Sequence, residues 1–309
     1  MKKQTVALVL LLALLGALPL FLPRFYTYIA AIVLITGLLA TSLNLAIGYG
    51  GIYQFHHAVF YGAGAYGTAL MLTRSPLPAP LGLLADPLVS AALSLAMGLI
   101  CIRLSKLYFG MLQISLGSLV WATVYRWYSF TGGDDGLHGI PVPDLVGSSQ
   151  GAYYSTLVVT ALCFLAMHRI VRSPFGKTLQ GIRDNPVRSA AIGVAVRRHQ
   201  LAALVIAGFF GGVAGSLFVV VDNSVFPDMM FWTFSLEVLI MCLLGGMYTF
   251  FGPLVGTSII VLLRVFVSVY TQYWSLLLGA LLTLVIIFLP DGVLGVLVRR
   301  LGWKEGLRA

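Results

Sequence analysis

The stretch LAALVIAGFFGGVAGSLFVVV, residues 201–221, contains no charged residue and decides the fold class. An α-helix needs about 20 consecutive apolar residues to cross the hydrocarbon core of a bilayer. Apolar runs of similar length recur along the chain, which has 309 residues, is 59% hydrophobic and is only 9% charged. Because these runs are continuous and do not alternate with polar residues, they favour membrane helices over the strands of an outer-membrane barrel. We therefore expect an all-α polytopic membrane protein and exclude a soluble enzyme, a disordered chain and a disulfide-stapled domain.

About ten transmembrane segments are expected. They are centred near Leu14, Leu38, Gly62, Leu95, Leu116, Ala161, Phe210, Leu239, Leu262 and Leu282. Residues 1–23 are predicted to be a first span that is kept as an uncleaved signal-anchor, since no small-residue cleavage site follows the apolar run. Residues 24–293 then form the transmembrane domain, and residues 294–309 form a basic tail.

The placement of charge assigns the loops to the two sides of the membrane. The net charge is +9, but in a polytopic protein Lys and Arg mark short cytoplasmic loops, so we expect no nucleic-acid partner. Seven of the 19 basic residues fall between Arg169 and Arg198, and the loop 172–199 is therefore predicted to be cytosolic, like the tail. The acidic loop 129–152 lacks Lys and Arg and is predicted to be external. With an even number of spans, both termini are cytosolic.

The cytosolic loop contains the signals of a short helix. Asn185 is a good N-cap, Pro186 suits the first helical position and Gly193 suits the stop. Small apolar residues recur between them at helical spacing, with arginines on either side. Such a helix is suited to a groove on a partner protein; the alternative is a loop helix that packs against its own chain.

Four blocks of sequence resemble, in order, the LivM-type permease subunits of ABC importers for branched-chain amino acids. They are SLNLAIGYGGIYQFHHAVFYGAGAY (42–66), TGGDDGL (131–137), SPFGKTLQGIRDN (173–185) and SLEVLIMCLLGGMYTFFGPLVG (235–256). The resemblance covers nearly the whole chain from about Tyr28 onward. It departs at Gln54-Phe55-His56-His57, where the family usually has a simpler Gly-His pair.

The resemblance implies an ABC importer permease fold in the bacterial inner membrane, with import of branched-chain or related amino acids. It implies as partners a second permease subunit in a heterodimer, two cytosolic ATPase subunits and an external solute-binding protein. It also makes the short cytosolic helix the ATPase-coupling segment, which comprises Arg183, Asp184, Asn185, Pro186, Arg188, Ala190, Ala191, Ile192 and Gly193.

The chain is not expected to hydrolyse ATP itself. Gly176-Lys177-Thr178 looks like the end of a phosphate-binding loop, but Val171 stands where that motif requires glycine. We find no other candidate, and no spacing typical of a metal or cofactor site. The protein is therefore predicted to be a transport subunit without a cofactor, and ATP hydrolysis is assigned to separate subunits.

Two glycine-rich regions, 48–67 and 245–256, predict broken helices. Irregular backbone at membrane depth is tolerated where it is buried in protein or lines a watery cavity, so these regions are candidate pathway walls; tight helix packing is the alternative. For the pairs Gly208/Gly212 and Gly211/Gly215 we favour packing. The candidate pathway residues are Asn44, Gln54, His56, His57, Tyr66, Glu237, Gly245 and Gly246.

The ionisable residues inside apolar segments require partners, because a charge in the bilayer is costly. Glu237 and Arg264 are predicted to pair or to face polar cavities, with Glu237 supporting the Gly245 turn. They would also support a different function: an ion-coupled carrier in which Glu237, Arg264 and the histidine pair bind the coupling ion. The basic helical loop and the missing phosphate-binding loop favour the ABC importer.

His56 and His57 are adjacent, so on a helix their side chains diverge by about 100° and do not easily share one metal ion. We expect either a hydrogen bond from one of them to a solute or packing against Tyr53 or Tyr66. The external loop contains Thr131, Gly132, Gly133, Asp134, Asp135 and Gly136. It lacks the ligand pattern of a calcium loop and is predicted to cap the pathway or to contact the binding protein, the alternative being an inert turn.

Overall fold

The computed structural model describes residues 15–74, 79–104, 106–270, 273–288 and 291–300. The helices are α2 (Arg24–Asn44), α3 (His57–Arg74), α4 (Ala79–Cys101), α5 (Lys106–Arg126), α6 (Tyr128–Thr131), α7 (Asp144–Gly147), α8 (Ser149–Arg172), α9 (Pro174–Asp184), α10 (Pro186–Ala191), α11 (Val196–Asp222), α12 (Trp232–Gly245), α13 (Gly252–Val267), α14 (Trp274–Phe288) and α15 (Gly292–Arg300). A π-helical turn (Leu45–Tyr49), two 3₁₀ turns (Gly133–Asp135 and Pro227–Met230) and the short strands β1 (Leu137–His138) and β2 (Ser224–Val225) complete the described elements.

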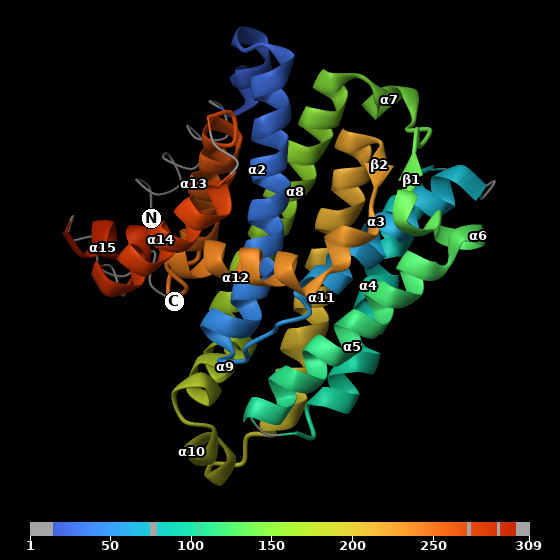
Figure 1. Ribbon diagram of the computed structural model, residues 1–309. Coiled ribbons are helices and arrows are strands. Elements are labelled where there is room, and N and C mark those ends of the chain that lie inside the picture. The colour runs from blue at the N-terminus through green and yellow to red at the C-terminus, as the bar shows by residue number, and fades with distance from the viewer. Residues whose placement is uncertain (1–14, 75–78, 105, 271–272, 289–290, 301–309) are drawn as a thin grey trace.

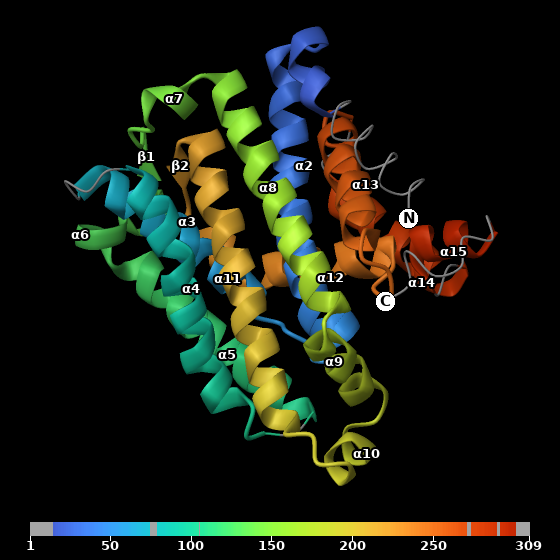
Figure 2. The ribbon, with the colours of Figure 1, turned by 180° about the vertical axis from the view of Figure 1, so that it is seen from behind.

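The core of the bundle is built around α2 and α11. Beyond their first turns, both helices are apolar on all sides, which is typical of helices buried within a bundle, and most of their residues are buried. Helices α3 and α4 pack against α11, whereas α8, α12 and α13 pack around α2 (Figure 1; Figure 2 shows α8 from behind). The expected all-α architecture is confirmed.

Most of the predicted segments coincide with helices. Each predicted centre from Leu38 to Leu282 falls inside a described helix, whereas the centre near Leu14 and most of the predicted first span lie outside the described residues. Among the described residues, four helices are long and apolar enough to cross a membrane: Arg24–Tyr49, Leu107–Arg126, Ser149–Arg172 and Val196–Asp222. Helix α12 has 14 residues, about 21 Å at 1.5 Å per residue, and runs across the bundle in Figure 1. It is therefore too short to span a bilayer core of about 30 Å alone.

Both glycine-rich regions contain the predicted breaks. Helix α2 passes through the π-helical turn into a non-helical segment, residues 50–56, before α3 begins inside the molecule. Helices α12 and α13 are joined by a tight turn, residues 246–251, in which a Cβ at Gly245 would overlap the carbonyl oxygen of Gly252. The predicted broken helices are thus present, and at the second break the two backbones are in close contact.

The glycines of α11 pack against neighbouring helices, as predicted. A Cβ at Gly215 would overlap the carbonyl oxygen of Tyr61 on α3, and a Cβ at Gly212 would lie 2.5 Å from Ser90 Oγ on α4. Small residues therefore let α11 approach both helices closely.

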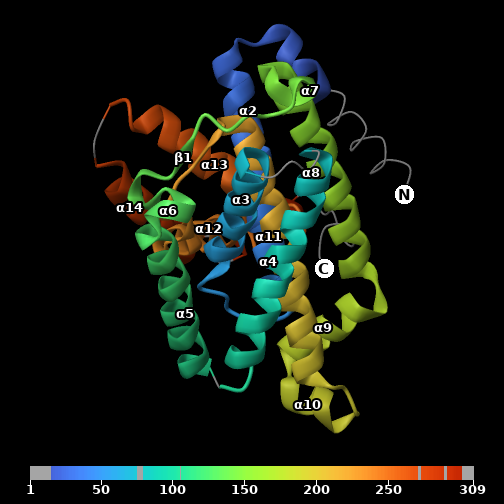
Figure 3. The ribbon, with the colours of Figure 1, turned by 90° about the vertical axis from the view of Figure 1, so that its right-hand side faces the viewer.

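The two predicted sides of the protein lie at opposite ends of the bundle. Strands β1 and β2 pair antiparallel, Leu137 with Val225 and His138 with Ser224, and so join the acidic loop 129–152 to residues 222–230, which hold Asp222 and Asp228, at one end. Helix α10 lies at the other end (Figures 1 and 3). Residues 294–300 of the predicted tail belong to α15, which packs against α12 and α13, and residues 301–309 lie outside the described part.

Candidate translocation pathway and coupling helix

The break between α2 and α3 is held by side chains from α2 itself and from two other helices, α12 and α5. Ser42 Oγ on α2 and His57 Nε2 share a hydrogen bond of 2.9 Å. The backbone N–H of Ala58 donates to Ser235 Oγ on α12 at 2.9 Å, and the N–H of Phe55 donates to Gln113 Oε1 on α5 at 3.0 Å. These contacts replace water at irregular backbone inside the protein.

Several polar atoms at this break have no hydrogen-bond partner among the described residues. They are both amide atoms of Gln54, the Nδ1 atoms of His56 and His57, and Nε2 of Gln113. The four side chains are at most 2% exposed. Because a buried polar group without a partner costs about 1–3 kcal/mol, the break carries hydrogen-bonding capacity that a solute or water can satisfy. Three of the predicted pathway residues, Gln54, His56 and His57, thus lie at the break between α2 and α3 and supply most of these unpaired polar atoms.

The histidine rings pack against Phe60, on the first turn of α3, and not against Tyr53 or Tyr66 as predicted. The ring centroids lie 5.0 Å apart for His56 and 6.0 Å for His57. Tyr66 lies farther along α3, in a separate apolar cluster with Ile140 and Val225 near the paired strands. Tyr66 does not reach the histidines because α3 carries residues 57 and 66 to different depths, about 13 Å apart at 1.5 Å per residue. The other alternative, a hydrogen bond from one histidine to a solute, stays a prediction.

Asn44, Gly245 and Gly246 form a second group at the α12–α13 turn. Asn44 Nδ2 donates to the carbonyl of Thr249 at 3.3 Å, whereas its Oδ1 atom has no partner in the described part of the chain. The Thr249 hydroxyl donates to the carbonyl of Gly246 at 2.9 Å. Asn44 therefore ties the end of α2 to this turn.

Glu237 and Arg264 pair with each other, which confirms one of the two predicted arrangements. Oε1 of Glu237 lies 3.3 Å from Nη1 of Arg264, and the two side chains are 15% and 49% exposed. The ion pair joins α12 to α13, the two helices on either side of the turn at residues 246–251. The predicted support of Gly245 by Glu237 stays a prediction.

Helix α10, which was predicted to lie on the cytosolic side, has the predicted caps. Asn185 Oδ1 accepts a hydrogen bond from the N–H of Arg188 at 2.8 Å, Pro186 is the first residue of α10, and Gly193 has φ 89° after its end. Pro186, Arg188, Ala190, Ala191, Ile192 and Gly193 are all exposed. Helix α10 therefore presents an open surface.

Arg183, predicted to belong to this contact surface, points the other way. Its guanidinium donates to the carbonyl of Gly48 in the π-helical turn at 2.6 Å, while the neighbouring carboxylate of Asp184 is 69% exposed. The sequence gives no signal for this direction, because the partner lies 135 residues away along the chain.

The predicted external loop is a compact turn. Three of its glycines, Gly132, Gly133 and Gly136, have positive φ, and the Thr131 hydroxyl donates to the carbonyls of Val124 and Trp127. The Tyr128 hydroxyl donates to the carboxylate of Asp134, and this hydrogen bond raises the pKa of Tyr128. Asp134 and Asp135 are exposed, so the turn presents carboxylates at its end of the bundle.

Two buried polar residues were missed by the sequence reasoning. Gln113 on α5 is fully buried, and so is Asp86 on α4, whose carboxylate accepts a hydrogen bond from the Thr68 hydroxyl at 2.7 Å. Asp86 could have been found as the one acidic residue of the apolar run 79–101, since a carboxylate inside a membrane helix is a functional candidate by default.

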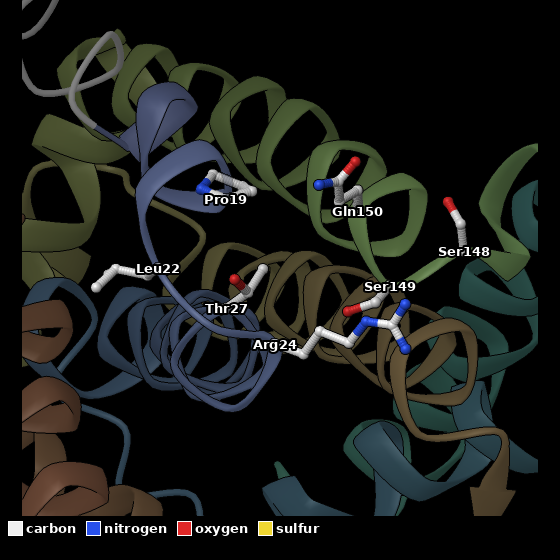
Figure 4. A pocket seen from close by; sticks show the side chains of 7 residues that line it. All are labelled: Pro19, Leu22, Arg24, Thr27, Ser148, Ser149 and Gln150. Carbon is white, nitrogen blue, oxygen red and sulfur yellow. The ribbon is translucent and has the colours of Figure 1, made fainter.

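A cavity of about 250 Å³ lies at the end of the bundle that carries α7, between the start of α2 and the start of α8. It is lined by Pro19, Leu22, Arg24, Thr27, Ser148, Ser149 and Gln150 (Figure 4). None of the predicted pathway residues lines it.

Comparison with known proteins identifies relatives across nearly the whole chain. The chain is 28% identical to the high-affinity branched-chain amino acid transport system permease protein LivM of Escherichia coli K12, over 98% of this chain and 78% of that protein. It is 22% identical to the probable branched-chain amino acid transport permease protein LivM of Methanocaldococcus jannaschii, over 83% of this chain and 89% of that protein. A shorter match, 28% identical over 27% of this chain and 26% of the relative, is to the guanosine ABC transporter permease protein NupQ of Bacillus subtilis. No solved structure matches.

The broken helices and the opposed acidic and basic ends described above agree with a membrane-embedded transport subunit. Residues 25–286 match the family described as "Branched-chain amino acid transport system / permease component", a range that includes both breaks, the turn at residues 131–136 and α10. The chain therefore belongs to the family of branched-chain amino acid transport permease components.

Proposed function

We propose that this chain is the membrane-spanning permease subunit of an ATP-driven, binding-protein-dependent importer, and that α10 is the surface on which an ATPase subunit docks. The observation that carries the proposal is the exposure of Val187 and Ile192, each 78%, on and beside a capped helix at the end opposite β1 and β2. Exposed apolar side chains on a preformed helix suit a hydrophobic groove on a partner.

The importer needs further subunits. The chain has no phosphate-binding loop, so two cytosolic ATPase subunits supply the energy, and a second permease subunit completes the pore as a heterodimer. The turn at Asp134 and Asp135 contacts an external solute-binding protein. In this arrangement α10 and both termini face the cytosol, in agreement with the positive charge of the 172–199 loop.

The proposed substrates are branched-chain or related amino acids. Support comes from the relatives in Escherichia coli and Methanocaldococcus jannaschii, whose names state branched-chain amino acid transport. The solute passes the polar group at Gln54, His56 and His57, whose unsatisfied donors and acceptors match a polar solute. When the docked ATPase subunits close and open, α10 transmits their movement to the membrane helices. The broken helices then change the side of the membrane from which the solute can reach the pathway.

The experiment tests α10 as the docking surface in the complete transporter. Val187→Asp combined with Ile192→Asp places two charges on the exposed apolar residues and should abolish copurification of the ATPase and leucine uptake. The amount of permease in the membrane should stay the same, because neither side chain is buried. The control is Lys177→Gln on α9, an exposed cation whose ammonium contacts Gln180 of the same helix at 3.4 Å. Full ATPase retention by the double variant would refute the assignment of α10.

The carrier alternative makes a different prediction for the isolated chain. If vesicles that contain only this chain take up leucine under an ion gradient without ATP, the carrier is correct. The Glu237–Arg264 ion pair argues against it, because each charge is already neutralised by the other and neither is left to hold a coupling ion.

A further inference from the structure

One side chain, Arg183, connects helix α9 to both helix breaks, the one between α2 and α3 and the one between α12 and α13. Arg183 lies in the last turn of α9, and its side chain is only 22% exposed. Nη1 donates to the carbonyl of Gly48 in the π-helical turn at 2.6 Å. The centre of the same guanidinium lies 5.4 Å from the ring centroid of Tyr248, in the α12–α13 turn. A charge-assisted hydrogen bond is roughly twice as strong as a neutral one, and the cation–π contact adds electrostatic attraction to the ring.

The first break is tightly packed around these contacts. A Cβ at Gly48 would overlap the carbonyl oxygen of Met247 and the side chain of Asn44, so the π-helical turn lies directly on the α12–α13 turn. At Gly51, where φ is 66°, a Cβ would lie 3.1 Å from the Cα of Arg183. The segment after the π-helical turn therefore packs directly against the backbone of α9. A movement of Arg183 would also displace this segment.

Helix α10 is joined to Arg183 by a very short connection. Asn185 is the one residue between α9 and α10. Its N–H donates to the carbonyl of Gly181 on α9 at 3.0 Å, and its side chain caps α10. A displacement of α10 thus reaches the last turn of α9 without a flexible linker.

We propose that Arg183 is a positioning residue that transmits movement of α10 to the π-helical turn of α2 and to the α12–α13 turn. The guanidinium holds the two breaks together in the state described, and displacement of α9 by a docked ATPase withdraws it from Gly48, which allows residues 50–56 to move. π-Helical turns inside α-helices often occur at functional sites. This inference rests on the proposed function, because it requires an ATPase that moves α10.

The test measures movement of the break directly and needs no knowledge of the solute. Tyr53, which is 52% exposed in the segment 50–56, is replaced by Cys after Cys101, Cys163 and Cys242 have been changed to Ala. The rate of maleimide labelling is measured on the complete transporter, without nucleotide and after trapping with ATP and orthovanadate. Coupling between distant sites typically corresponds to about 5–150-fold, so we expect at least about a fivefold change in rate between the two states.

Arg183→Gln removes the positive charge and replaces the guanidinium by a shorter, uncharged amide. It should reduce the nucleotide-dependent change in labelling to less than about twofold, while the ATPase remains bound. Arg183→Lys, which keeps a charged donor, should recover part of the change. Lys177→Gln, the loss of an exposed cation on the same helix, should behave as the parent does. If Arg183→Gln fails to accumulate, Tyr248→Leu replaces it and should at least halve the change.

Three results would contradict the inference itself. It is wrong if the parent shows no nucleotide-dependent change, or if Arg183→Gln, or Tyr248→Leu in its place, keeps the full change. Loss of ATPase binding in Arg183→Gln also contradicts it, since Arg183 would then be a docking contact. If the parent transporter binds no ATPase at all, the proposed function fails, which is a separate and recognisable outcome.

Discussion

The hydroxyl of Ser235 accepts a hydrogen bond from the backbone N–H of Ala58, at a distance of 2.9 Å, and this contact fixes α12 to the first turn of α3. The first N–H groups of a helix have no partner within the helix, and α3 begins inside the protein, where water does not supply one. A side chain of another helix therefore replaces the missing acceptor. The same principle holds for Phe55, whose N–H donates to Gln113.

Ser235→Ala should destabilise the protein, because it leaves the buried N–H of Ala58 without an acceptor. The expected loss is about 1–3 kcal/mol, measured as a lower midpoint of thermal unfolding of the permease in detergent. Ser115→Ala on α5 is the matched control: Ser115 is exposed and donates to the carbonyl of Met111 in its own helix. Equal midpoints for the two variants would show that the Ala58 contact contributes nothing.

Gly215→Ala should weaken the packing of α11 against α3. The new methyl group would overlap the carbonyl oxygen of Tyr61 and lie 2.8 Å from the backbone nitrogen of Ala65, and neither backbone atom can move without shifting α3. Overpacking of this kind costs about 1–3 kcal/mol, and should lower the thermal midpoint. Gly279→Ala on α14, where a Cβ meets nothing within 4 Å, should leave the midpoint unchanged. If both variants unfold at the same temperature, the close approach of α11 and α3 is not a stabilising feature.

Features that depend on local sequence could be predicted. Continuous apolar runs predicted the helices, since a helix in lipid must satisfy its own backbone. The caps of α10 were predicted from Asn185 and Gly193, because capping depends on residues within one turn. The separation of acidic and basic loops followed from their charge alone.

Features that depend on which helices meet could not be predicted. Gln113 lies on α5 and reaches the break at Phe55 only because α5 packs beside it, and Arg183 turns inward because Gly48 and Tyr248 are brought to it by the fold. Tyr66 was grouped with the histidines from nearness in sequence, but the rise of α3 separates them. The short length of α12 was also missed: the break after Gly245 was predicted from its glycines, but hydropathy does not show that the helix before it begins only at Trp232.

The Glu237–Arg264 pair should act on stability and not on solute affinity. A double-mutant cycle with Glu237→Gln, Arg264→Gln and both together should give an interaction energy of about 0.5–3 kcal/mol in unfolding experiments. Each single variant leaves one charge in an apolar segment, so the double variant should be more stable than their summed effects predict. Leucine affinity of the assembled transporter should be the same in all four proteins. A change in affinity with additive stabilities would instead place the pair in the solute pathway.

Asn185→Ala should weaken ATPase binding without affecting insertion of the permease. The substitution removes the acceptor that caps α10, which costs about 1 kcal/mol and so lowers the affinity of the ATPase by about fivefold, if docking requires the helix to be formed. The measurement is a titration of purified ATPase onto permease held in lipid nanodiscs. Asn185→Asp keeps an N-cap acceptor and should bind nearly as the parent does. Equal losses in the two variants would mean that the amide itself contacts the ATPase, and no loss in Asn185→Ala would mean that binding is independent of the cap.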